Sequence, residues 1–196
     1  PGVSAFVGRS GAVFTFVGGE LAPSASGTFA ALHAVAWAGA RDLVVAGEEG
    51  TLIVLRDGTP TRIETRVEST LRDIVVLGPR EWIVVGDHGV FLRVVNDQAS
   101  PIDVGGDEDL LAATKLGDGV LVVGSEGVAL RWNRRSVERE TSGSRRVLRG
   151  IGQCRSEEIY VVGDEGTVIR RDAAGTYAPV ANRSRESLTD VACRDG

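Results

Sequence analysis

The sequence predicts an all-β fold, a five-bladed β-propeller with four antiparallel strands in each blade. Three observations predict it. One glycine-containing phrase recurs five times at a nearly constant spacing, which indicates a repeat architecture. Short β-branched runs between turn residues fill each repeat. The first repeat lacks one strand, and a matching segment stands at the end of the chain.

The recurring phrase is Val-Gly-x-x-Gly, with Ala in place of the Val in the second copy. Successive copies lie 39, 39, 38 and 39 residues apart. A tight turn between two strands needs positive φ angles, which glycine adopts at low cost, so each copy predicts a hairpin. The glycines expected to build these hairpins are Gly8, Gly11, Gly47, Gly50, Gly86, Gly89, Gly124, Gly127, Gly163 and Gly166.

Four strand-like runs make up each repeat. In the second repeat they cover residues 31–38, 42–46, 51–55 and 61–67, with turn residues between them. The runs are rich in β-branched residues, as strands are. The same plan predicts strands in the later repeats at 71–77, 81–85, 90–95, 99–104, 110–116, 120–123, 128–132, 136–141, 147–153, 157–162, 167–171 and 176–181.

The two ends of the chain predict how the ring closes. The first repeat begins at a second strand, 3–7, and continues with 12–17 and 20–25, whereas residues 188–193 match the first-strand pattern. We therefore expect one split blade of three N-terminal strands and one C-terminal strand, which protects the strand edges. A β-solenoid remains the alternative fold. The predicted single domain is 1–196, with blades at 1–28 plus 186–196, 29–68, 69–107, 108–146 and 147–185.

The composition is typical of a folded domain, with 42% hydrophobic and 25% charged residues among 196. No apolar run approaches the roughly 18 residues of a membrane-spanning helix. The net charge of −5 argues against nucleic-acid binding. The chain begins at Pro1 and contains no Met, which suggests an excised domain and leaves its compartment and parent protein unknown. We expect a monomer without cofactor or metal.

The two cysteines, Cys154 and Cys193, do not have the spacing of metal ligands. Both fall on predicted first strands. Two interpretations stay open. They are small buried thiols, or they form a disulfide between neighbouring repeats, whose geometry the sequence cannot define.

Charges segregate on the face that carries the hairpins and the blade-to-blade connections. Arginines gather around the fifth and first blades, and acids around the second and third. We interpret this as a polarised docking face, because such fields steer association with a charged partner. Charged turns that merely keep a propeller soluble are the alternative. The residues predicted to bind are Arg9, Arg145, Arg146, Arg183, Arg185, Glu48, Glu49 and Asp87.

Two further patterns have competing interpretations. Arg93, Arg131 and Arg170 each stand four residues after the second glycine of a hairpin. They predict either an anion-binding cluster or bonds to neighbouring acids and carbonyls within each blade. The acidic loop 106–109 offers oxygen ligands for Ca²⁺ but lacks the alternating spacing of a calcium loop.

Catalysis is only weakly indicated. Glycoside hydrolysis needs two carboxylates on either side of the sugar, and Asp73, Asp109 and Asp190 are the acids on first strands. His33 and His88 stand in different kinds of element and suggest no triad. The three tryptophans fall on three strand types and so form no repeated sugar platform. An enzyme is therefore not predicted.

The extended phrase Val-Gly-x-x-Gly-Thr-x-x-Arg resembles the repeats of photosystem II assembly-factor-like propellers and, more loosely, the Asp-box repeats of bacterial neuraminidases. Residues 162–170 and 85–93 carry it best, and 172–177 is similar to the family's Asp-Gly-Gly-x-Thr-Trp turn. The resemblance implies the propeller fold, which supports many functions. We expect a bacterial-type, non-enzymatic scaffold that docks a protein or another domain of its parent chain. A carbohydrate-binding or glycoside-hydrolysing propeller, with its site at the channel mouth, is the alternative.

Overall fold

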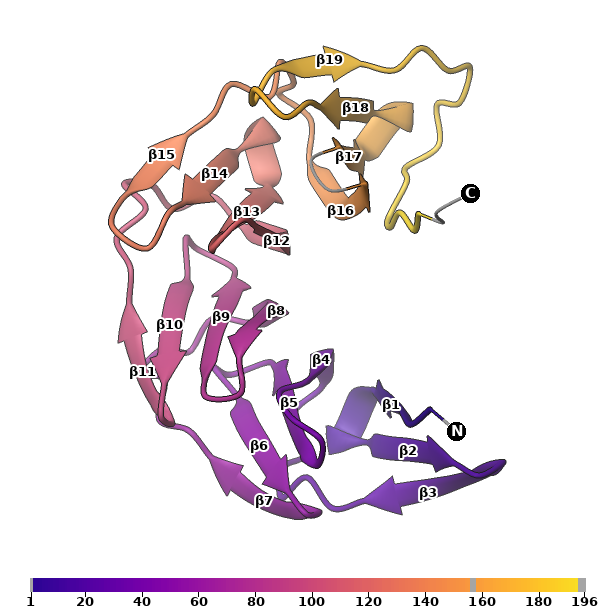
Figure 1. Cartoon of the computed structure of the whole chain (residues 1–196), viewed down its shortest axis with the longest axis vertical. Helices are drawn as coiled ribbons and strands as arrows, with labels where there is room; N and C mark the ends of the chain where they lie inside the picture. The colour runs from indigo at the N-terminus through magenta and orange to yellow at the C-terminus, as the bar shows by residue number, and fades with distance from the viewer. Residues whose placement is uncertain (1, 156–157, 194–196) are drawn as a thin grey trace. The chain divides into compact units, whose positions relative to one another are not determined.

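Five antiparallel sheets make up the described part of the chain, residues 2–155 and 158–193 of a computed structural model (Figure 1). The first sheet has three strands and the others have four, joined in chain order, as the repeats predict. Residue 157, the predicted start of one strand, and residues 1 and 194–196 of the predicted split blade lie outside the described residues.

The chain divides into two compact units, Pro1–Ile102 (unit 1) and Asp103–Gly196 (unit 2). The strands of unit 1 are β1 (Ser4–Val7), β2 (Val13–Val17) and β3 (Glu20–Ser24), then β4 (Leu32–Trp37), β5 (Asp42–Gly47), β6 (Leu52–Arg56) and β7 (Thr59–Arg62), then β8 (Leu71–Gly78), β9 (Glu81–Gly86), β10 (Phe91–Val95) and β11 (Gln98–Pro101). The strands of unit 2 are β12 (Leu110–Leu116), β13 (Gly119–Gly124), β14 (Ala129–Trp132) and β15 (Val137–Arg139), then β16 (Leu148–Arg155), β17 (Glu158–Gly163), β18 (Val168–Arg171) and β19 (Tyr177–Pro179).

Each Gly-x-x-Gly phrase forms a turn between two paired strands. In the four-stranded sheets these are the second and third strands, and in the three-stranded first sheet they are β1 and β2. Three of these turns are short 3-10 helices, η1 (Arg9–Gly11), η2 (Ser125–Gly127) and η3 (Asp164–Gly166). The residue before the second glycine is left-handed in all five copies, with φ between 54° and 57°. The first glycine is extended instead. Glycine is needed at this position for lack of space, because a Cβ on Gly47 would overlap the Ala31 carbonyl.

The fourth strands end earlier than the sequence predicts. The second sheet illustrates this, because β7 stops at Arg62 although the alternating pattern runs to residue 67. Ile63 still donates its N–H to the carbonyl of Leu52 at 2.9 Å. The chain then leaves the sheet because Thr65 turns back and its Oγ1 donates to the carbonyl of Gly50 at 2.8 Å. A side-chain hydrogen bond thus replaces the last ladder bonds.

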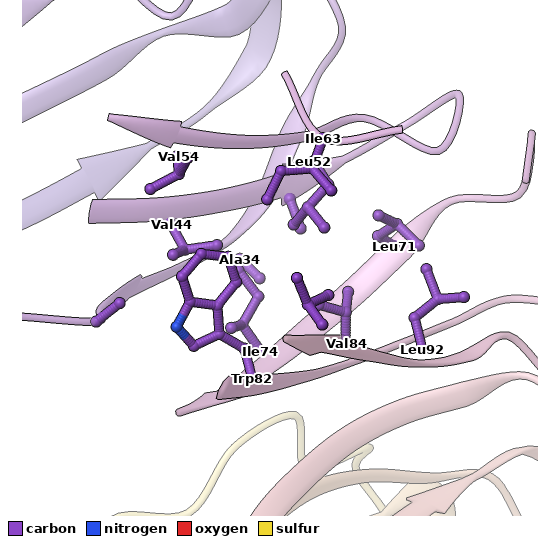
Figure 2. Packing of buried hydrophobic residues seen from close by; sticks show 13 residues of the cluster. Ala34, Val44, Leu52, Val54, Ile63, Leu71, Ile74, Trp82, Val84 and Leu92 are labelled. Atoms are coloured by element: carbon purple, nitrogen blue, oxygen red, sulfur yellow. The ribbon is translucent and has the colours of Figure 1, made fainter. Parts of the chain in front are cut away.

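The core lies between neighbouring sheets, so the middle strands are buried on both faces. In unit 1, one cluster joins the second and third sheets around Trp82, with Val44, Val84 and Leu92 beside it (Figure 2). In unit 2, an equivalent cluster joins the fourth and fifth sheets. Burial on both faces explains why second strands such as β5 are almost continuously apolar.

The first sheet leaves one apolar face bare within unit 1. Phe6, Phe16 and Leu21 lie on it with 52%, 41% and 57% of their surface exposed. The residues that correspond to Phe6 in the other sheets are fully buried. They are Val45, Val84, Val122 and Val161. An apolar sheet face of this kind normally packs against another surface.

The C-terminal segment follows β19 and runs back beside β16 (Figure 1). Its residues 188–193 are not assigned as a strand, contrary to expectation. A disulfide joins Cys193 to Cys154, with 4.8 Å between the Cα atoms, so the interpretation of these residues as free thiols is wrong. Gly150 and Gly152 of β16 make room, because a Cβ on either would meet the backbone of residues 189–191 at less than 3.0 Å.

Candidate functional site

In the first, second, fourth and fifth repeats, a side-chain hydrogen bond fixes the loop that leads out of the sheet over the hairpin of that repeat. The hydroxyl or amide donates to the carbonyl of the second glycine at 2.7–2.8 Å. The donors are Ser26, Thr65, Ser142 and Asn182. Together, these hairpins and loops form what we call the hairpin face of each unit. The sequence signal, a short polar residue 15 or 16 positions after the second glycine, is visible only once the repeats are aligned.

The eight predicted binding residues divide between the units. Arg145, Arg146, Arg183 and Arg185 lie in unit 2, all exposed on the connections of its hairpin face. The remaining four, Arg9, Glu48, Glu49 and Asp87, lie on hairpins of unit 1. Within unit 2, Arg146 contacts Glu165 at 2.6 Å. The side chains of Arg145, Arg183 and Arg185 have no ion-pair partner among the described residues.

Two of the predicted acids are already engaged inside unit 1. Asp87 accepts two hydrogen bonds of 2.7 Å from Arg72. Glu48 lies 3.7 Å from His33 at the same position of the second sheet. In the fifth sheet, Arg149 and Asp164 occupy the same two positions and make the same kind of contact. The hydrogen bond from Arg149, together with one from Ser187, lowers the pKa of Asp164. In these three sheets, the acid that follows the first hairpin glycine therefore serves as the partner of a basic side chain on the first strand of its own sheet.

The three arginines that follow a hairpin by four residues bond to neighbouring acids within their own blades, which is the second of the two interpretations given above. Arg93 contacts Glu81 at 2.7 Å, and Arg170 contacts Glu158 at 3.3 Å. Each pair lies within one sheet, on adjacent strands. Arg131 contacts Glu138 at 3.2 Å in the same way. These arginines therefore stabilise their own blades.

The acids considered for catalysis also have local partners. The carboxylate of Asp73 accepts a hydrogen bond of 2.7 Å from the next backbone N–H, and that of Asp190 does the same. They lie in different units. Glu108 of the acidic loop holds Arg139, a hydrogen bond that lowers the pKa of Glu108. In the described ranges, no group of three or more His, Cys, Asp or Glu side chains is placed to hold a metal ion.

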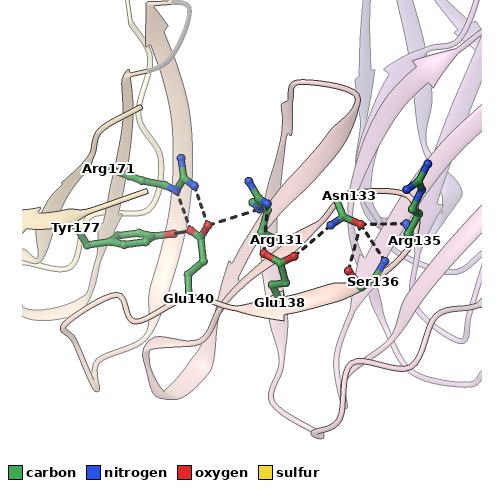
Figure 3. Close-up of polar contacts among 8 residues, drawn as sticks. All are labelled: Arg131, Asn133, Arg135, Ser136, Glu138, Glu140, Arg171 and Tyr177. Atoms are coloured by element: carbon green, nitrogen blue, oxygen red, sulfur yellow. Dashed lines mark hydrogen bonds and ion pairs between the residues drawn. The ribbon is translucent and has the colours of Figure 1, made fainter. Parts of the chain in front are cut away.

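A buried ionic network joins the fourth and fifth sheets of unit 2 (Figure 3). Arg171, whose side chain is 4% exposed, donates to both oxygens of Glu140 at 2.7 and 2.8 Å. The hydroxyl of Tyr177 donates to the same carboxylate at 2.7 Å, and Arg131 lies 3.9 Å away. Burial raises the pKa of Glu140, but the hydrogen bonds from Arg171 and Tyr177 outweigh it and the net pKa is lowered.

Two cavities open beside this network on the hairpin face of unit 2. The first, of about 370 Å³, is lined by residues 126–129 and 139–145, including Arg145. The second, of about 260 Å³, is lined by apolar residues of the fifth sheet, by Arg146 and by three hydroxyl residues, Ser142, Ser144 and Thr167. Residues 142–144 line both cavities and form the wall between them. Sequence reasoning found the arginines but missed the cavities. The first depends on how the connection folds back over its own sheet, and the second on how this connection packs against the fifth sheet.

No protein-family model and no curated protein matches the sequence. Solved structures with the same fold include YCF48 bound to D1 peptide, at 13% identity and a TM-score of 0.68, covering 94% of this chain and 63% of that one. YCF48 from Cyanidioschyzon merolae matches at 15% identity and a TM-score of 0.65, covering 90% and 67%. The C-terminal WD40 domain of Sif2 matches at 12% identity and a TM-score of 0.66, covering 88% and 53%.

These likenesses, together with the five antiparallel sheets, define the fold as that of a β-propeller. The resemblance of the repeats to photosystem II assembly-factor propellers agrees with the YCF48 structures at the level of fold. The chain spans less than two thirds of the length of the YCF48 chain in the peptide complex. Within the described residues, no helix is long and apolar enough to cross a membrane.

Proposed function

We propose that the chain is a non-enzymatic propeller module that docks a protein, or another domain of its parent chain, through its hairpin face. One observation carries the proposal. Three exposed arginines, Arg145, Arg183 and Arg185, stand on the connections of unit 2, where two cavities open, and none of the three has an ion-pair partner within the described part of the chain. A propeller of similar fold, YCF48, is bound to a peptide. The partner surface that fits exposed guanidinium groups is an acidic polypeptide segment.

Charge reversal of the basic residues tests this docking. With a fluorescein-labelled glutamate-rich peptide as probe, changing four arginines to Glu is expected to slow association about tenfold or more at low salt, because steering is lost. The four are Arg145, Arg146, Arg183 and Arg185. Stopped-flow anisotropy at several salt concentrations measures the association rate.

The matched control keeps the same change in net charge but places it on turns at the opposite ends of the strands. It changes Arg41, Arg80, Arg134 and Arg135 to Glu. An association rate that responds equally to both sets, or to neither, would contradict docking at the hairpin face. The unit 1 residues Arg9, Glu48, Glu49 and Asp87 are proposed as further contacts for partner groups of opposite charge.

We further propose that the split blade closes the ring and makes a monomer. In the full sheets, the residue before the first strand packs over the first hairpin glycine, so a Cβ on Gly47 or Gly163 would overlap it. Among the described residues, nothing lies within 4 Å of the Cβ position of Gly8, at the corresponding place beside β1. The first sheet of unit 1 thus lacks only its first strand, and its bare face carries Phe6 and Phe16.

Unit 2 holds a segment that begins like a first strand. Leu188 donates its N–H to the carbonyl of Gly163 at 3.0 Å, as Leu32 at the start of β4 does to Gly8. Gly166 donates to Glu186 at 2.8 Å, in the way that Gly11 donates to Ala30. The proposed first blade therefore consists of residues 1–28, which supply three strands, and residues 186–196, which supply the missing first strand.

Hydrogen exchange tests the closure. The amides of β1 that point away from β2 are expected to exchange slowly in the intact chain. Removing residues 187–196, with Cys154→Ser to avoid a free thiol, is expected to speed their exchange about a hundredfold or more, since strand pairing protects amides. The amides of β9 serve as the internal control. Fast exchange of the outward β1 amides in the intact chain, or a dimer by light scattering, would contradict closure within one molecule.

A further inference from the structure

The two cavities of unit 2 are neighbours that share one wall, residues 142–144, and hydrogen bonds hold this wall in place. Ser142 donates its Oγ to the carbonyl of Gly127 at 2.7 Å and accepts the N–H of Ser144 at 3.2 Å. Ser144 in turn accepts the N–H of Arg146 at 3.0 Å. The wall, residues 142–144, is therefore fixed before any partner arrives, which limits the entropy lost on binding.

The second cavity combines apolar residues with the polar side chains of Ser142, Ser144, Thr167 and Arg146. Val168, Ile169, Pro179 and Val180 line it, and Val180 keeps 38% of its surface exposed. Tyr177 also lines it, and its hydroxyl is fixed by Glu140 (Figure 3). A pocket of this size and lining suits one apolar side chain, such as leucine, because burial of its surface is favourable.

The first cavity differs from the second in charge. Arg139 and Arg145 line it, and Arg145 has no ion-pair partner among the described residues. Glu126 also lines it, and the buried Glu140 is committed to Arg171. An incoming carboxylate can therefore pair with Arg145 without displacing an existing bond.

We infer that these cavities are one recognition site for an extended polypeptide segment in which an apolar side chain and an acidic one are separated by one residue. The apolar side chain enters the cavity of Val180 and Tyr177, and the carboxylate faces Arg145 across the wall of residues 142–144. This inference rests on the proposed docking of an acidic protein segment and names what that segment must contain. In an extended segment, side chains two residues apart point the same way, which suits two adjacent receptors.

Fluorescence anisotropy with three labelled peptides tests the inference. One repeats Leu-Ser-Glu-Ser, which places Leu and Glu two residues apart, the second has Ser for every Leu, and the third has Lys for every Glu. The wild-type chain is expected to bind the first about tenfold or more tighter than either of the others. Val180→Asp and Arg145→Glu are each expected to weaken binding of the first peptide about tenfold, and Val180→Ser is the milder variant should the aspartate disturb folding.

Matched controls separate this inference from the proposed function. Val180→Ile keeps the lining apolar, and Arg62→Glu reverses an exposed charge on β7 of unit 1, so both are expected to bind within about twofold of wild type. Equal binding of the leucine and serine peptides, with no effect of either Val180 variant, would overturn the recognition site while leaving salt-dependent docking intact. No binding of any glutamate peptide would overturn the proposed function itself.

Discussion

Replacing Glu140 by alanine is expected to lower the free energy of unfolding by about 3–5 kcal/mol. The change leaves the guanidinium of Arg171 buried without its partner, and it removes the acceptor of the Tyr177 hydroxyl. An uncompensated buried charge costs far more than the ion pair itself contributes. Urea unfolding followed by tryptophan fluorescence measures the change.

The matched comparison for Glu140 comes from unit 1. The equivalent positions, 13 and 5 residues after a second hairpin glycine, hold the buried Ile63 and Val94 there. A variant with Glu140→Ile and Arg171→Val is therefore expected to unfold at a free energy close to wild type or higher, because well-packed apolar residues often replace a buried ion pair without loss. If the double variant loses as much stability as Glu140→Ala, the cost lies in packing rather than in the stranded charge.

The stability that Glu140 contributes depends on pH in a definite direction. Its pKa in the folded chain lies below the usual value of 4.5, so the folded state favours the carboxylate. The contribution is complete above pH 4.5 and is lost as the pH falls through the lowered pKa. As the pH falls through this range, wild type is accordingly expected to lose more unfolding free energy than the apolar double variant, which has no carboxylate at this position.

Reducing the disulfide is expected to lower the free energy of unfolding by about 4 kcal/mol. Cys154 and Cys193 are 39 residues apart, and a cross-link across a loop of that length removes much of the freedom of the unfolded chain. Urea unfolding of the wild-type chain with and without dithiothreitol measures the loss. The double variant Cys154→Ser and Cys193→Ser is expected to match the reduced chain and to be insensitive to the reductant.

The opposite result for the disulfide is equally clear. An unfolding midpoint that dithiothreitol does not move would mean that the C-terminal segment is unstructured whether or not it is tethered. Hydrogen exchange in residues 186–193 distinguishes the cases, since the bonds from Gly166 to Glu186 and from Leu188 to Gly163 are expected to weaken only in the reduced chain.

The repeats predicted the number and order of the sheets because hairpin glycines are required by backbone geometry alone. Gly50 shows this directly, since a Cβ there would overlap the carbonyl of Val67. The alternating pattern could not predict where the fourth strands end. In the second sheet, the hydrogen bond from Thr65 to the carbonyl of Gly50 ends the ladder, and this bond depends on the folded loop. The pairing of Cys154 with Cys193 was also open, as both a buried thiol and a disulfide suit a first strand.

The candidate site was predictable only in its exposed charges. Arg145 and Arg146 stand out in the sequence, but the cavities that they line depend on how the connection after β15 folds over the fourth sheet and meets the fifth. The network of Glu140 and Arg171 joins residues 31 positions apart in different blades. Its signal is a charged residue at each of two aligned positions where the second and third blades carry apolar ones, which becomes visible only when burial is known.

The bare first sheet has a consequence for biosynthesis. Under the proposed closure, β1 waits for residue 188, which the ribosome adds 181 residues after Val7. At about 5–20 residues per second, the nascent chain carries an unpaired strand edge and uncovered phenyl rings for roughly 10–40 s. The yield of soluble protein is then set by how well chaperones shield this sheet before translation ends, and slower translation lengthens the period of risk.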